Sequence, residues 1–148
     1  MTSINIASEH AARHSQSIEL AFNPGPVQIM GDARAFRQIF INLLSNSVKF
    51  SPPGSSIKIT VDLTRMDSLE VKVEDSGPGI DPKYRALIFE PFSQIEGVES
   101  RSRPGAGIGL SIVKAYTELH GGIVSISDAS LGGAMFTIRF PSWRVKTA

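Results

Sequence analysis

The spacing of the apolar residues changes abruptly after Phe50, and this change constrains the fold more than any other feature. Between Ala33 and Phe50 apolar residues recur every three or four positions, which predicts an amphipathic helix. The shared face of this helix carries Phe36, Ile39, Phe40, Leu43 and Leu44. After Pro52-Pro53-Gly54, apolar and polar residues alternate over residues 57–63 and 69–73, which predicts two strands with one buried face. This succession indicates helices packed on one face of a mostly antiparallel sheet.

The rest of the chain predicts shorter elements. Ile18–Phe22 and Val27–Met30 flank a turn sequence, Asn23-Pro24-Gly25-Pro26, and are expected to pair as a hairpin. Further helices are expected at residues 6–16 (weakly), 82–89 and 108–120, and closing strands at residues 123–127 and 134–140. The predicted fold class is an α/β (α+β) sandwich, in which about three helices cover one face of a mixed, mostly antiparallel sheet of about five strands.

Length and composition exclude several classes of protein. The 148 residues suit a single compact domain, 1–148, of which residues 1–17 are a leading segment. Lys and Arg number 15 and Asp and Glu 14, which argues against a nucleic acid partner bound through bulk charge. The absence of cysteine excludes disulfides and thiolate chemistry. Because no apolar run approaches the roughly 20 residues of a membrane span, we expect a cytoplasmic domain without membrane contact.

One side of the predicted long helix carries a row of polar side chains. Gln38, Asn42, Asn46 and Lys49 lie within about 80° of one another on a helical wheel, opposite the apolar face. Amide oxygens suit Mg²⁺, which keeps several waters and shares phosphates, and a lysine can meet a phosphate as a point charge. The simpler interpretation is that this row is the solvated side of an amphipathic helix.

The second predicted strand leads to an acidic residue on its buried side. Its inward positions are Leu69, Val71 and Val73, and its outward positions are Glu70, Lys72 and Glu74. The alternation therefore aims Asp75 at the core, where a carboxylate is costly unless its acceptors are used. In the following Ser76-Gly77-Pro78-Gly79-Ile80, glycines let a flat ligand approach the backbone and Ile80 offers an apolar wall. Either Asp75 accepts from the amine of an adenine, or the strand ends one residue earlier and Asp75 caps a turn.

A second glycine-rich segment, Gly105-Ala106-Gly107-Ile108-Gly109, opens the helix expected at 108–120. The N–H groups at the start of a helix form a ready site for anions. The spacing matches neither a Walker loop nor a dinucleotide fingerprint. The preceding segment, 93–107, reads as a mobile loop in which Arg101 and Arg103 reach a terminal phosphate. The alternative is an ordinary flexible loop with solvated arginines.

Taken in order, four segments resemble the motifs of sensor histidine kinases. Residues 42–50 resemble their N box, residues 75–80 their first glycine box, residues 89–92 their F box and residues 105–114 their second glycine box. The resemblance covers essentially the whole chain and implies a Bergerat-type ATP-binding fold. Two departures are Ser47, where alanine is usual, and Ala134, where relatives often carry Ser or Thr near the adenine.

The resemblance also implies roles for individual residues. Asn46 and Asn42 would hold Mg²⁺, and Lys49 would contact phosphate. Asp75 would accept the adenine amine, and residues 93–107 would form an ATP lid that Phe89 and Phe92 couple to the body. The implied nucleotide-binding residues are Asn46, Lys49, Asp75, Gly77, Gly79, Ile80, Phe89, Phe92, Arg101, Arg103, Gly105, Gly107, Ile108, Gly109 and Leu110.

The implied activity is that of an ATP-dependent protein-histidine kinase. The γ-phosphoryl group would pass to a histidine on a separate helical dimerisation domain and then to a response-regulator receiver domain, within a homodimeric full-length protein. Hydrolytic relatives place a water-activating glutamate where this chain has Asn42, so its absence fits transfer to a side chain. The alternatives are an anti-sigma-factor-type serine kinase and a nucleotide-binding module without transfer activity.

The histidines of the chain lack the sequence context of a phosphoacceptor. His10 and His14 lie four residues apart on the weakly predicted first helix, where metal binding or phosphoacceptance is the alternative to ordinary surface positions. His120 precedes Gly121-Gly122, a sequence that stops helices, and is expected to be solvated. The acceptor histidine is therefore expected on another domain.

Overall fold

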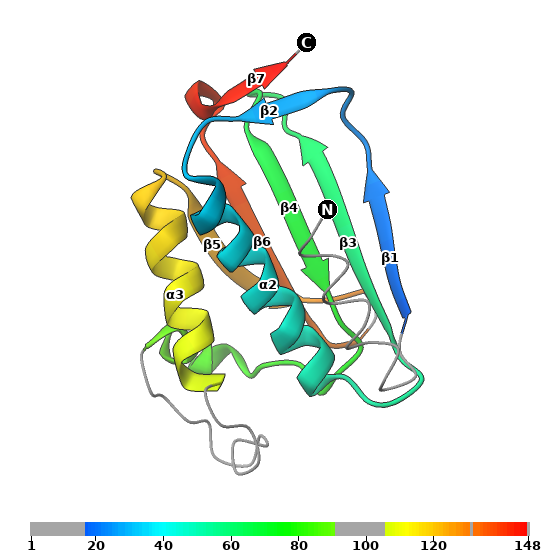
Figure 1. The fold of residues 1–148 in the computed structure, drawn as a ribbon. Helices are drawn as coiled ribbons and strands as arrows, with labels where there is room; N and C mark the ends of the chain where they lie inside the picture. The colour runs from blue at the N-terminus through cyan, green and yellow to red at the C-terminus, as the bar shows by residue number, and fades with distance from the viewer. Residues whose placement is uncertain (1–16, 91–105, 131, 148) are drawn as a thin grey trace.

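The computed structural model describes residues 17–90, 106–130 and 132–147, which form a sheet with helices on one face (Figure 1). The five-stranded sheet has the order β1-β3-β4-β6-β5, with β1 parallel to β3 and every other pair antiparallel. Its strands are β1 Ser17–Phe22, β3 Ser56–Leu63, β4 Leu69–Glu74, β6 Ala134–Phe140 and β5 Ile123–Asp128. Two long helices, α2 Ala33–Phe50 and α3 Ala106–Leu119, pack on it. The predicted fold class is confirmed, while the weak helix expected at 6–16 lies outside the described residues.

The long helix α2 has the predicted bounds because both of its ends are specified locally. The carboxylate of Asp32 accepts from the backbone N–H of Arg34 at 2.8 Å, which caps the first turn. At the other end, the N–H of Ser51 donates to the carbonyl of Ser47, and two prolines follow. The apolar face enters the core, where Ile39 and Leu43 are fully buried.

The hairpin expected between residues 18–22 and 27–30 does not form. Strand β2, Val27–Ile29, pairs instead with β7, Val145–Thr147, and together they form a separate two-stranded sheet. Reciprocal bonds fix this pairing, because the N–H of Met30 donates to the carbonyl of Arg144 at 2.7 Å and the Arg144 guanidinium donates to the carbonyl of Met30 at 2.8 Å. The partner comes from the far end of the chain, so local spacing could not indicate it.

The short helix expected at 82–89 is instead two 3-10 turns, η1 Pro82–Tyr84 and η2 Leu87–Phe89.

Helix α3 differs from its prediction in two respects. It begins at Ala106 rather than Ile108, so Gly107 belongs to its first turn and not to the loop. Its buried residues are Leu110, Val113 and Thr117. It also ends at Leu119 rather than His120, and Leu119 is 74% exposed.

His120 is buried and not solvated, which corrects a second expectation. Its Nε2 accepts from the N–H of Asp32 at 3.1 Å, and its Nδ1 donates to the carbonyl of Tyr116 at 2.8 Å. The ring also lies 4.5 Å from that of Phe36. The turn at Gly121, with φ of 74°, folds the chain back so that the end of α3 is joined to the start of α2.

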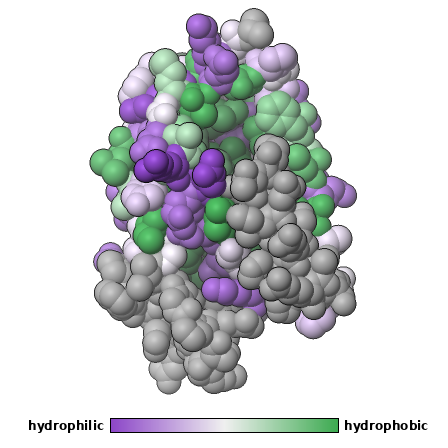
Figure 2. Space-filling view, viewed as in Figure 1, coloured by the Kyte–Doolittle hydropathy of each residue, from purple (hydrophilic) through white to green (hydrophobic). Residues whose placement is uncertain are grey.

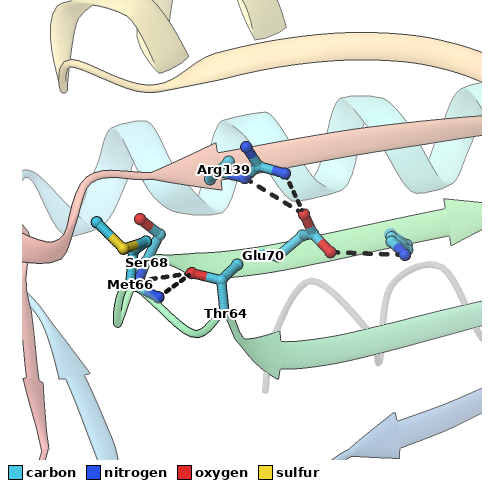
Figure 3. A network of polar contacts seen from close by, with 6 residues as sticks. Thr64, Met66, Ser68, Glu70 and Arg139 are labelled. Carbon is cyan, nitrogen blue, oxygen red and sulfur yellow. Dashed lines mark hydrogen bonds and ion pairs between the residues drawn. The ribbon is translucent and has the colours of Figure 1, made fainter.

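The sheet face opposite the helices carries a charged network at the start of β4 (Figure 3). Glu70 accepts from Arg139 Nη2 at 2.7 Å and Nε at 3.3 Å and pairs with Lys72 at 3.5 Å. The hydrogen bonds from Arg139 are the main cause that lowers the pKa of Glu70. The adjoining turn is held by Thr64, whose hydroxyl accepts from the N–H groups of Met66 and Ser68.

None of the helices in the described ranges is long and apolar enough to cross a membrane.

Candidate functional site

Three parts of the fold that carry the predicted site residues meet at one end of the molecule. The end of β4, the C-terminal half of α2 and the first turn of α3 all lie at the bottom of Figure 1. The loop that follows β4 and the turn between β5 and β6 close this end. Figure 2 shows hydrophilic residues gathered in the middle of the helix-covered face. The predicted residues from the N-box and first glycine-box segments are therefore brought to one end of the fold.

Asp75 is buried, with 4% of its surface exposed. Strand β4 ends at Glu74, and the Oδ1 atom of Asp75 accepts from the N–H of Gly77 at 3.0 Å and from the N–H of Ala134 at 3.1 Å. Asp75 therefore caps the following turn, as one interpretation expected, and its carboxylate is also buried, while the contact with an adenine amine stays a prediction.

The hydrogen-bond partners of the Asp75 carboxylate are neutral backbone amides. In the described part of the chain, both hydrogen bonds end on Oδ1, and no ion pair includes this residue. Burial is the main cause that raises the pKa of Asp75, against the opposing effect of the two backbone amides. Within the described residues, the hydrogen bonds of the Asp75 side chain thus leave Oδ2 without an assigned donor.

The backbone around Asp75 is packed tightly against the turn before β6. The N–H of Gly133 donates to the carbonyl of Asp75 at 3.2 Å, and the N–H of Asp75 donates to the carbonyl of Ala134 at 3.0 Å. A Cβ atom at Gly133 would lie 2.6 Å from the nitrogen of Gly77 and would also contact the Asp75 carboxylate. Gly79, at φ 77°, faces the carbonyl of Gly133. Gly133 was not predicted as a site residue, although the Gly132-Gly133 pair was a visible signal.

The apolar residues assigned to the site line its inner side. Phe89 and Leu110 are buried in the core, where the ring of Phe89 meets that of Phe136 edge-on at 6.3 Å, and Ile80 packs against the same core. Arg85 holds this side in place, since its Nε donates to the carbonyl of Ile80 at 3.2 Å and its Nη2 to Asp128 at 2.8 Å. The sequence analysis missed Arg85.

The polar row on α2 faces α3 and is not simply a solvated surface. The Nδ2 of Asn42 donates to the carbonyl of Gly109 at 3.2 Å, and its Oδ1 accepts from Gln38 at 2.8 Å. Asn46 and Lys49 lie half-buried further along the same helix. The row therefore borders the start of α3, and the solvated interpretation is wrong for Asn42.

Glu74 was expected to point outward to solvent, but it is only 8% exposed. Its Oε1 accepts from the N–H of Ser130 at 3.1 Å and from the Ser130 hydroxyl at 2.9 Å. Alternation places Glu74 on the open face of the sheet, where Ser130 from the turn between β5 and β6 donates to it. Nothing in the local sequence could have indicated this.

Several predicted residues cannot be placed. Phe92, Arg101, Arg103 and Gly105, together with almost all of the expected lid at 93–107, lie outside the described residues. Gly107 and Ile108 belong to the first turn of α3.

A comparison with protein families and curated proteins gives consistent matches. A family model described as histidine kinase-, DNA gyrase B-, and HSP90-like ATPase matches residues 31–144. The histidine-protein kinase/phosphatase MprB of Mycolicibacterium vanbaalenii is 41% identical over 132 residues, which are 88% of this chain and 26% of that protein. The sensor histidine kinase TmoS of Ectopseudomonas mendocina is 43% identical over 110 residues, which are 74% of this chain and 11% of that protein. The chain thus spans about a quarter or less of the curated relatives it matches.

Solved structures agree with these matches. The mycobacterial sensor histidine kinase MprB superimposes with a TM-score of 0.84 at 30% identity, over 95% of this chain and 91% of that one. Full-length ShkA, solved in complex with AMPPNP, gives a TM-score of 0.82 at 29% identity, over 99% of this chain and 29% of that one.

Proposed function

The chain belongs to the family of histidine kinase-, DNA gyrase B- and HSP90-like ATPases, and we propose that within this family it serves as the catalytic ATP-binding domain of a sensor histidine kinase. In this role it binds ATP and transfers the γ-phosphoryl group to a histidine of a separate helical domain. The observation that carries the proposal is the buried carboxylate of Asp75, which keeps one oxygen for a ligand. The domain comprises residues 1–148, with a lid at 93–107, and acts in the cytoplasm, where ATP is available.

Asp75 selects adenine over guanine. Its Oδ1 is fixed by two backbone amides, so Oδ2 accepts from the exocyclic amine of adenine. Guanine carries a carbonyl oxygen at the corresponding ring position, which an ionised carboxylate repels. Ile80 packs beside the glycine turn and supplies an apolar surface for the ring.

The triphosphate lies toward the start of α3 and the end of α2. The free N–H groups at the first turn of α3 attract anions, and the Asn42 amide holds that turn against α2 through the carbonyl of Gly109. Lys49, in the last turn of α2, contributes a positive charge on the same side.

The donors in this region fit a magnesium ion that arrives with the nucleotide. The described residues contain no group of three or more His, Cys, Asp or Glu side chains able to hold a metal. Asn46 offers an amide oxygen, which suits Mg²⁺ shared with phosphates, whereas both ends of the Asn42 amide are already engaged. We therefore assign the ion mainly to Asn46. A bound Mg²⁺ ion would neutralise part of the phosphate charge.

The absence of a base on α2 favours transfer over hydrolysis. Helix α2 contains no acidic residue, so no carboxylate on it can activate water. His120, bonded at both ring nitrogens, is not available as an acceptor. Because His10 and His14 also lack the sequence context of a phosphoacceptor, we place the acceptor on a helical phosphoacceptor domain of the full-length homodimeric kinase, and a receiver domain accepts the phosphoryl group next.

Phosphotransfer to a supplied helical phosphoacceptor domain tests the proposal. The chain incubated alone with labelled ATP and Mg²⁺ should bind nucleotide, gain almost no acid-labile phosphate and hydrolyse ATP slowly. With its own phosphoacceptor domain added as a separate polypeptide, it should label the histidine there, slowly because covalent linkage is lost. Asn46→Ala should abolish this labelling, and the thermal unfolding midpoint of the variant, measured alongside, shows that the loss does not come from unfolding.

Three results would contradict the proposal. Acid-stable label on a serine of a supplied protein would favour the anti-sigma-factor-type kinase. Robust labelling of His10 or His14 would place the acceptor within the chain. Nucleotide binding without any transfer to the cognate phosphoacceptor domain would favour a binding module.

A further inference from the structure

A second buried carboxylate lies beside Asp75, and the proposed phosphotransfer does not use it. Glu74 is 8% exposed, although it stands on the face of the sheet that the helices leave open. Its Oε1 accepts two hydrogen bonds, from the backbone N–H and the hydroxyl of Ser130, at 3.1 and 2.9 Å. A buried carboxylate that binds a single turn residue twice points to a positional role for that turn.

The turn between β5 and β6 holds both acids at once. Bonds from Ala129 N–H to the carbonyl of Gly133 and from Gly132 N–H to the carbonyl of Ala129 close the turn, at 2.8 and 3.1 Å. On one side Ser130 reaches Glu74, and on the other the N–H of Ala134 reaches Oδ1 of Asp75. The turn therefore connects Ser130, which is bonded to Glu74, with Gly133 and Ala134, which are bonded to Asp75.

Ser130 depends on Glu74 because packing does not hold it. Ser130 is exposed, whereas the preceding residue, Ala129, is buried. The bonds to a charged acceptor are stronger than those between neutral groups, so Glu74 contributes much of the restraint on this part of the turn.

We propose that Glu74 is a positioning residue for adenine recognition. By anchoring Ser130 it keeps the turn where the N–H of Ala134 fixes Oδ1 of Asp75, and it thereby leaves Oδ2 directed at the exocyclic amine. This inference rests on the proposed function, since it assigns the specificity of the same nucleotide site.

The role of Glu74 in adenine recognition can be tested with two nucleoside diphosphates of the same charge, ADP and IDP. IDP carries a carbonyl oxygen at C6 and a proton at N1, where ADP carries the amine and an unprotonated nitrogen. The ratio of their Kd values, measured by calorimetry with Mg²⁺, therefore reports recognition of this edge of the base, which includes the proposed Asp75 contact. We expect Glu74→Ala to weaken ADP about five- to tenfold and to change IDP less than about twofold. Glu74→Gln keeps a carbonyl oxygen for both Ser130 donors and should retain a ratio close to that of the wild type.

Two further variants complete the design. Ser130→Ala removes only the hydroxyl donor at the surface, so it should lower the ratio by a smaller factor, and it serves as the main test if Glu74→Ala does not fold. Glu70→Gln, on the same strand but bonded to Arg139, is the matched control and should leave the ratio unchanged. Equal weakening of ADP and IDP by Glu74→Ala, or an unchanged ratio in Ser130→Ala when Glu74→Ala does not fold, overturns the inference.

The wild-type protein separates this inference from the proposed function. If the wild type binds ADP and IDP equally, adenine recognition by Asp75 fails and the proposed function fails with it. If the wild type prefers ADP and Glu74→Ala keeps that preference, only the role of Glu74 fails.

Discussion

The two ends of strand β4 carry acids in opposite electrostatic settings. At its start, Glu70 is met by the guanidinium of Arg139 and the ammonium of Lys72, and these partners lower the pKa of Glu70 (Figure 3). Just past its end, the Asp75 carboxylate accepts from two backbone N–H groups of the described residues, and burial raises the pKa of Asp75. The difference is consistent with the proposed roles, in which Glu70 serves the fold and Asp75 binds a ligand.

The contrast follows from the partners that replace water around each carboxylate in the folded state. Glu70 gains cations on an accessible sheet face, so its ionisation supports the folded state. Asp75 gains two neutral donors on one oxygen, so its ionisation opposes folding until a ligand supplies another donor. A cost of this kind is retained where binding needs it.

The strongest test of this comparison is Asp75→Asn. The amide would still accept from Gly77 and Ala134 but would present a donor to the adenine amine in place of an acceptor. We expect ADP affinity to fall by about 1.5–3 kcal/mol, or roughly 10- to 150-fold, in calorimetry.

The same variant should be at least as stable as the wild type without nucleotide. Because the folded-state pKa of Asp75 lies above its ordinary value of 3.8, ionisation costs stability as pH rises above that value. Asp75→Asn removes this cost, so its advantage in unfolding midpoint should appear at neutral pH and vanish as pH falls below about 3.8. Unchanged ADP affinity, or an advantage that persists in acid, would refute this account.

A smaller effect on ADP binding is expected from Gly133→Ala, which adds one carbon next to Asp75. The Cβ of Gly133→Ala would lie 2.5 Å from the carbonyl oxygen of Asp75 and 2.6 Å from the nitrogen of Gly77, both of them backbone atoms. We expect a loss of about 1–3 kcal/mol in unfolding free energy, measured by urea denaturation, together with weaker ADP binding.

Gly25→Ala provides the matched control for that substitution. A Cβ at Gly25 has no neighbour within 4 Å, so its stability should stay close to that of the wild type. Wild-type stability in Gly133→Ala would mean that the turn before β6 is free to move away from Asp75, contrary to the close packing described above.

The smallest effect on stability is expected from a substitution of Glu70, at the other end of β4. Glu70→Gln weakens a partly exposed ion pair, and we expect a loss of about 1 kcal/mol or less at neutral pH with no change in nucleotide binding. Because the pKa of Glu70 is lowered, its stabilisation is present above its ordinary value of 4.5 and is lost as the pH falls through the lower folded-state pKa. At neutral pH without nucleotide, Asp75→Asn should therefore raise the stability of the fold and Glu70→Gln should lower it. A change of the same sign in both variants would contradict the comparison.

Local patterns in the sequence determined most of the framework. The period of 3.6 and the cap at Asp32 set the bounds of α2, and strict alternation placed β3, β4 and the inward orientation of Asp75. Four motifs in order indicated the family that the matched model later supported over residues 31–144. These features were readable because each depends on residues close together in the chain.

The sequence was less informative about the site. It indicated Asp75, the glycine turn and the polar row on α2, yet the contact between Asn42 and Gly109 appears only when α3 is packed against α2. Gly133 and Arg85 escaped notice because their roles depend on neighbours from distant segments.

Tertiary structure alone decided the remaining features. The pairing of β2 with β7, the burial of His120 against the cap of α2 and the enclosure of Glu74 by Ser130 all join residues far apart in the chain. Alternation and helical period report which side of an element is apolar, and they carry no information on which distant segment covers it. That choice is made when the layers pack, because only then do buried donors and acceptors find their partners.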